Sequence, residues 1–114
     1  MLPKPHRLTL KTELQRLQKE GKIFHSPLFG LLVGRQPIPI GVSRFGFIIS
    51  KKIHKLAVKR NRIKRLLREA VKGFLPQVKP GSDAVFLAKK KILHQELPVV
   101  QTEVQAVFKK AGLL

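Results

Sequence analysis

Apolar residues recur with a helical period near both ends of the chain. Leucines follow one another at i, i+4 and i+7 from Leu10, which predicts a helix that starts after Thr9 or Thr12 and ends at Gly21. Valines and a phenylalanine with the same period predict a second helix over residues 98–111, and a glycine directly follows it.

Between these helices the period shortens to that of strands. Residues 23–33 hold short apolar runs broken by proline and glycine, and residues 41–50 alternate in part between larger apolar side chains and other residues. Residues 84–88 form another apolar run of strand length. Residues 35–39 and the Pro80-Gly81 pair predict turns. The pattern therefore predicts strands in the middle of the chain and again near residue 86.

A further helix is expected from about Ala57 to residues 73–76, and it overlaps the most basic stretch of the sequence, residues 50–72. This stretch contains ten Lys and Arg residues and one acid, Glu69. The apolar positions of the expected helix have helical spacing and are Ile63, Leu66, Leu67, Ala70, Val71 and Phe74. At about 100° per residue, the opposite face holds Asn61, Arg65, Arg68 and Lys72, with Arg62 and Lys64 on its flanks. One helix thus both packs on a core and presents charge.

Composition identifies the kind of partner that this charge requires. The chain has 114 residues, 43% of them hydrophobic, which predicts one folded domain (1–114), with residues 1–8 as an extended arm. Its net charge of +18 favours nucleic acid. An anionic membrane surface fits less well, because tryptophan is absent and aromatic residues are few. With no signal-peptide pattern or membrane-spanning run, we expect a soluble, cytoplasmic protein.

The side chains that commonly carry catalysis are dispersed. Six acidic residues and four histidines are scattered over the expected elements, and cysteine is absent. No two acids stand at metal-ligand spacing within one element, and no phosphate-binding loop of the Walker type occurs. We therefore expect no catalytic residues, no metal and no small-molecule substrate for the protein alone, and interpret the chain as a binder.

The segment Arg60-Asn61-Arg62, followed by Lys64-Arg65 and Arg68-Glu69 and preceded by Ser50-Lys51-Lys52, resembles the signature of the bacterial ribonuclease P protein subunit. Weaker similarity extends over most of the chain. The resemblance implies an α+β fold, a single-domain α-β sandwich of order αβββαβα. It also implies a left-handed βαβ crossover, against the usual right-handed preference.

The resemblance further implies a function. In this family the RNA subunit, with Mg²⁺, removes the 5′ leader of precursor tRNA, and the protein binds both RNAs. The residues expected to contact the RNA subunit are Lys51, Lys52, Lys59, Arg60, Asn61, Arg62, Lys64, Arg65, Arg68, Lys72, Lys89, Lys90 and Lys91. A structural ribosomal protein is the alternative with the same charge, and a protein-only nuclease is a third class that the dispersed acids disfavour.

Two features depart from the family pattern. The resemblance places the leader in a cleft between the first helix and the sheet, where aromatic residues are usual; Leu14, Gln18 and Leu32 occupy those positions here. Phe24, Phe45 and Phe47 are the residues expected to supply the missing aromatic rings of the cleft. For Phe45 and Phe47, the alternation with Ile49 on one face favours core packing over base stacking. In addition, the loop before Arg60 is one residue longer and carries His54-Lys55-Leu56 where the family commonly has a glycine.

Overall fold

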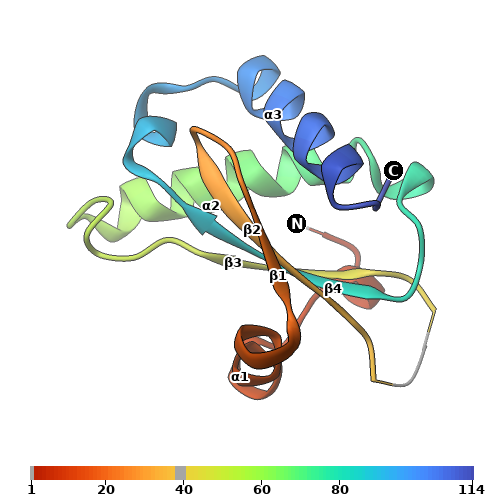
Figure 1. Cartoon of the computed structure of the whole chain (residues 1–114). Coiled ribbons are helices and arrows are strands. Elements are labelled where there is room, and N and C mark those ends of the chain that lie inside the picture. Colours follow the sequence, from red (N-terminus) through yellow and green to blue (C-terminus); the bar gives the residue numbers. More distant parts are fainter. Residues whose placement is uncertain (1, 38–40) are drawn as a thin grey trace.

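The computed structural model describes residues 2–37 and 41–114, which build a four-stranded sheet with helices on both faces (Figure 1). The elements are η1 (Lys4–His6), α1 (Leu10–Glu20), β1 (Lys22–His25), β2 (Phe29–Arg35), β3 (Arg44–Ile48), α2 (Ala57–Lys72), η2 (Leu75–Gln77), β4 (Ser82–Ala88), η3 (Lys90–His94) and α3 (Leu97–Lys110), where η denotes a 3-10 turn. Apart from these turns, the predicted order αβββαβα is confirmed. The end of the turn expected at 35–39 lies outside the described residues.

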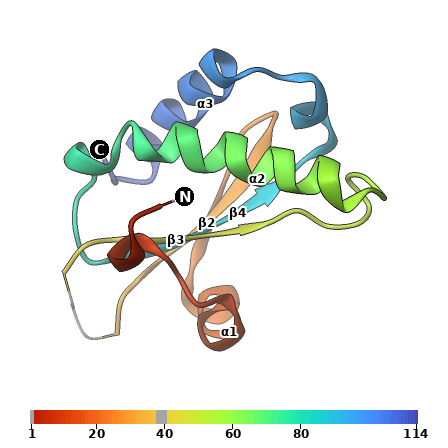
Figure 2. The ribbon, with the colours of Figure 1, turned by 180° about the vertical axis from the view of Figure 1, so that it is seen from behind.

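The sheet has the strand order β1-β2-β4-β3. Strands β1, β2 and β4 pair antiparallel, whereas β3 and β4 pair parallel, so that α2 connects two neighbouring parallel strands. Helices α2 and α3 cover one face of the sheet, and α1 crosses the other face (Figures 1 and 2). The three layers place the first helix and the basic helix on opposite sides of one sheet.

The main core lies between the sheet and helices α2 and α3 and is rich in phenylalanine. The ring of Phe86 on β4 is its centre, with centroid distances of 5.0 Å to Phe29, 5.2 Å to Phe47 and 6.0 Å to Phe108. Such pairs contribute about 0.5–1.5 kcal/mol beyond their buried area. The core under α1 is smaller and is formed by Leu8, Leu17, Leu32 and Val85, with Leu10, Leu14, Ile48 and Leu87 packed against it.

Helix α1 begins and ends at residues that the sequence pattern predicted, Thr9 and Gly21, but for other physical reasons than a side-chain cap and a left-handed glycine. Of the two candidate threonines, Thr9 is the N-cap, but only its carbonyl oxygen takes part, accepting from the N–H groups of Thr12 and Glu13. Gly21 follows the helix with a negative φ of −80°. A Cβ there would lie 2.5 Å from the carbonyl oxygen of Leu17, so close backbone approach requires the glycine.

The N-terminal segment is packed, which differs from the extended arm expected over residues 1–8. Two prolines favour the 3-10 turn η1, and Leu2 is buried against the main core. Arg7 forms a parallel bridge with Phe45, whose carbonyl oxygen accepts a hydrogen bond of 3.0 Å from the Leu8 N–H. The segment thus covers part of the outer edge of β3, which would otherwise expose unpaired backbone groups.

Candidate nucleic-acid interface

Helix α2 faces the core with one side and solvent with most of its charge. Its buried residues are Ile63, Leu67, Ala70 and Val71. The exposed polar residues from the predicted set are Lys59, Asn61, Arg62, Arg65 and Lys72, while Arg60, Lys64 and Arg68 are half-buried. Arg68 lies at the border of the exposed face rather than opposite the core, because its guanidinium is 6.0 Å from the ring centroid of Phe47.

Two of the predicted RNA contacts also hold the fold together. The Arg60 guanidinium donates hydrogen bonds of 2.9 Å and 2.8 Å to the carbonyl oxygens of His54 and Lys55. The Lys89 ammonium donates one of 2.8 Å to the carbonyl oxygen of Ser26, at the turn between β1 and β2. Arg60 therefore shapes the loop before α2, and Lys89 ties the end of β4 to that turn.

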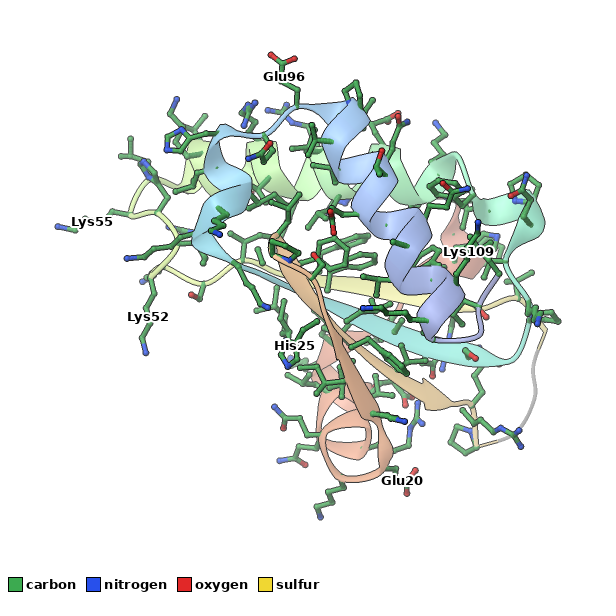
Figure 3. All side chains as sticks on the ribbon, turned by 45° about the horizontal axis from the view of Figure 1, so that its top comes forward. Glu20, His25, Lys52, Lys55, Glu96 and Lys109 are labelled. Atoms are coloured by element: carbon green, nitrogen blue, oxygen red, sulfur yellow. The ribbon has the colours of Figure 1, made fainter. Side chains whose placement is uncertain are left out.

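Exposed lysines continue the basic surface beyond α2. Lys51, Lys52 and Lys55 lie in the loop between β3 and α2, and Lys90 and Lys91 lie on η3; all five are exposed. Figure 3 shows Lys52 and Lys55 extending away from the body of the molecule. Lys55 was not among the predicted contacts, although its place in the same charge run was a signal for it.

The α1 face of the sheet is only partly covered. Pairing of Ile23 with Leu32, and of His25 with Gly30, places these residues on the face that α1 crosses. Ile23 is 44% exposed and His25 is exposed as well. Of the predicted leader-contacting residues, Leu14 and Leu32 belong to the core under α1, and Gln18 on α1 is exposed. Together they border a strip of sheet surface beside the helix.

The three phenylalanines expected to replace the cleft aromatics lie on the other face. Phe45 and Phe47 are 2% and 8% exposed and pack in the main core under α2 and α3. Phe24 is half-buried against the same core, because its partner Leu31 faces it. Phe45 and Phe47 nevertheless line a hollow of about 220 Å³ together with Leu10, the first residue of α1. The expectation that these phenylalanines contact the leader stays a prediction.

Helix α1 is fixed to the sheet by a carboxylate that, in the sequence alone, is one of six scattered acids. Asp83 on β4 is fully buried and accepts hydrogen bonds from Arg44 (2.8 and 2.7 Å) and from Arg16 (2.6 Å). Arg16 also binds Glu13 at 2.8 Å and the carbonyl oxygen of Arg35 at 2.8 Å. This cluster joins α1, β2, β3 and β4 at one end of the sheet.

Two further features bear on the kind of site. Within residues 2–37 and 41–114, no three His, Asp or Glu side chains come together in a group that could hold a metal ion. The same residues form no helix of the length and apolarity that crossing a membrane demands. Fold and surface together define a small, strongly basic α+β protein of the nucleic-acid-binding class, with its exposed charge concentrated on one helix and the loop that precedes it.

Comparisons with known proteins identify the family. The model of the family "Ribonuclease P" matches residues 2–112. The ribonuclease P protein component of Synechococcus sp. (strain JA-2-3B'a(2-13)) is 38% identical, with 100% of this chain and 87% of that protein covered. That of Roseiflexus castenholzii is 34% identical, with 99% and 91% covered. The chain belongs to the ribonuclease P protein family, whose members are the protein component of an endoribonuclease.

Solved structures agree with this assignment. A Staphylococcus aureus RNase P protein, a mutant with defective mRNA degradation activity, superposes with a TM-score of 0.86 at 25% identity, covering 97% of this chain and 92% of the other. The RNase P protein from Thermotoga maritima gives a TM-score of 0.81 at 25% identity, with 91% and 96% covered. The similarity thus extends over the sheet and all three helices rather than the basic helix alone.

Proposed function

We propose that this protein binds the RNA subunit of ribonuclease P through the exposed side of α2, the loop before it and η3. The observation that carries the proposal is the continuous set of exposed cations on these three elements, which adjoin one another in the fold. An RNA surface supplies phosphates at the density that such a set can neutralise, and each neutralised phosphate releases counterions. Because the chain belongs to the ribonuclease P family, we infer that this RNA is the RNA subunit of ribonuclease P.

We further propose that the 5′ leader of precursor tRNA lies on the α1 face of the sheet. The strip beside α1 offers Ile23, His25 and Gln18 to solvent and is separated from α2 by the thickness of the sheet. The phenylalanines of the described residues belong to the main core on the other face, so in this proposal the leader is held by contacts with Ile23, His25 and Gln18 rather than by stacking on phenylalanine.

Removal of the leader, in this proposal, is chemistry of the RNA subunit. The dispersed acids of the described chain do not fit a Mg²⁺ site, and we assign no catalytic step to a protein side chain. The protein raises local cation density and positions the leader, and Mg²⁺ belongs to the RNA. Processing of precursor tRNA would place the protein in the cytoplasm.

Reconstitution tests the proposal. The protein is added to a bacterial ribonuclease P RNA at low Mg²⁺, with a leader-bearing precursor tRNA as substrate. We expect cleavage at a Mg²⁺ concentration at which the RNA alone is nearly inactive, and no cleavage by the protein alone. If the protein leaves the rate of the RNA unchanged, the proposed function is wrong.

A leaderless tRNA provides the matched control for the second part. The reconstituted holoenzyme should bind the precursor more tightly than the mature tRNA, and the protein should enlarge that ratio. Equal tightening of both tRNAs by the protein would show that it supports the RNA subunit without contacting the leader.

A further inference from the structure

A hollow of about 640 Å³ lies between the loop before α2 and the turn η3. Residues 51–56 of the loop line one side, and Lys90 and Leu93 line the other. We call it the Leu56 hollow. Its apolar lining, called the floor below, consists of half-buried Ile53 and Leu93 and of Leu56, which is 56% exposed. The other lining residues, called the rim, are His54 and four lysines, Lys51, Lys52, Lys55 and Lys90, with no acid among them.

Leu56 is an unexpected residue for its place in the fold. It is the N-cap of α2 and makes no side-chain cap hydrogen bond, whereas Ser, Thr, Asp or Asn at this position stabilises a helix. It also leaves more than half of a leucine in water, in a loop where polar residues are usual. Folding alone therefore does not explain the choice of leucine at this position.

The hollow is preformed by hydrogen bonds within the loop. Arg60 donates to the carbonyl oxygens of His54 and Lys55, as described above, and the N–H of Leu56 donates to the His54 Nδ1 at 3.1 Å. A loop held by three hydrogen bonds loses less conformational freedom on binding than a free one.

We propose that the Leu56 hollow receives one unpaired nucleobase of the ribonuclease P RNA, with the flanking phosphates on the four lysines. The inference rests on the proposed function and adds a specific contact to it. Four cations around an apolar floor require a partner that is both polyanionic and locally apolar, and an extruded nucleobase between two phosphates meets both requirements. The hollow is also continuous with the exposed cations at the start of α2.

The variant Leu56→Ser separates this role from a role in folding, because the two effects have opposite signs. Serine supplies the missing N-cap, so the Tm should rise by roughly 3–6 °C. Loss of the apolar floor should weaken binding to the RNA subunit by roughly 5- to 10-fold. The slope of log affinity against log salt should stay unchanged, because no phosphate contact is lost. Binding at wild-type strength would overturn the proposal.

Val99→Ser is the matched control. Val99 is 47% exposed on the first turn of α3, outside the proposed RNA-binding surface, and does not line the hollow. This variant should bind the RNA with wild-type affinity, and an equal loss for both variants would mean that no particular hollow is involved. Lys55→Ala should instead lower the salt slope by about 1, as expected for a lysine on the rim.

Photocrosslinking identifies the nucleotide. The chain has no cysteine, so Leu56→Cys introduces a single thiol for a short azidophenacyl label. A crosslink to one unpaired nucleotide supports the proposal, and an abasic substitution at that nucleotide should abolish the difference between the wild type and Leu56→Ser. Crosslinks confined to paired nucleotides, or no crosslink in a complex that forms normally, would refute it.

The nucleobase contact and the proposed function can be refuted separately. If Leu56→Ser binds normally while the protein still stimulates cleavage by the RNA, the nucleobase contact is wrong and the proposed function stands. If the wild-type protein neither binds nor stimulates the RNA, the proposed function itself is wrong.

Discussion

Replacing Asp83 with asparagine tests what holds helix α1 on the sheet. The substitution keeps the size of the side chain and removes its charge. Asp83 is 0% exposed, and its carboxylate accepts hydrogen bonds from the two guanidinium groups and from the Gln36 side-chain amide at 3.2 Å. Its partners are more accessible, with side-chain exposures of 17% for Arg16 and 20% for Arg44. The variant would leave two cations close together without the buried anion between them.

The size of the effect follows from this difference in burial. Removing one partner of a buried ion pair typically costs about 3–5 kcal/mol, because a charge is left unpaired in the interior. The arginines here retain some solvent, and Glu13 still pairs with Arg16 at 2.8 Å. We therefore expect the lower end, about 3 kcal/mol, for Asp83→Asn. That is a large part of the roughly 5–15 kcal/mol that stabilises a typical domain.

Urea unfolding followed by far-UV circular dichroism measures the loss, since the chain has neither tryptophan nor tyrosine for fluorescence. Glu13→Gln is the control. Its side chain is 23% exposed and belongs to the same cluster, so we expect a loss below about 1 kcal/mol. A loss below about 1 kcal/mol for Asp83→Asn as well would refute the reasoning that the buried carboxylate anchors α1.

The pH dependence of this penalty follows from Arg44. Hydrogen bonding to Asp83 raises the pKa of the Arg44 guanidinium above its ordinary value, desolvation opposes the increase, and the charges of Asp83 and Glu13 add to it. When folding raises the pKa of a group, the resulting stability is fully present at any pH below the pKa of the unfolded state. It is lost only as the pH rises through the higher pKa of the folded state. The Asp83→Asn penalty should thus be equal at about pH 7 and about pH 10. A clear decrease over that interval would contradict this assignment.

Three further predictions concern other parts of the molecule. Neutralising Arg65 and Arg68 together should lower the slope of log RNA affinity against log salt by about 1 to 2, and an unchanged slope would show that neither meets a phosphate. Gly21→Ala should cost about 1–3 kcal/mol in urea unfolding, because its Cβ would lie 2.5 Å from the Leu17 carbonyl oxygen; an unchanged midpoint would refute this. Gln18→Phe should raise the preference of the holoenzyme for leader-bearing over leaderless tRNA by roughly 5-fold, through stacking; a constant ratio would place the leader elsewhere.

The helices were predictable because their periodicity and their stops are local. Residues 57–72 and 97–110 form α2 and α3 within about one residue of the predicted starts, and Gly73 and Gly112 follow them closely. The strand at β4 was also found, two residues short at its start. The packed turn at η1 and the turn η3 were missed, because short 3-10 turns have no period to detect.

The sheet faces and the anchoring cluster were not predictable in the same way. Alternation shows that Phe45 and Phe47 share a face, but the identity of the helix that covers it depends on the strand order. Asp83 meets Arg44 and Arg16 across 39 and 67 residues of sequence, and a count of scattered acids cannot reveal such contacts. The resemblance to the ribonuclease P family predicted the RNA partner and the crossover connection between β3 and β4. No local pattern in the sequence contains either of them.

The strand register places the two proposed RNA contacts at one end of the sheet. The Asp83 cluster holds α1 at one end of the sheet, where Asp83 on β4 pairs with Gly34 on β2 and with Arg44 on β3. At the other end, Leu87 pairs with Gly30 and Ile48, and the chain leaves β3 there toward the lysines of the loop. A leader lying on the uncovered strip of β1 and β2 would therefore lie at the same end of the sheet as the loop that presents its charge to the RNA subunit. Loosening α1 at its anchored end should disturb the leader contact and leave the α2 surface intact, because the sheet separates the two.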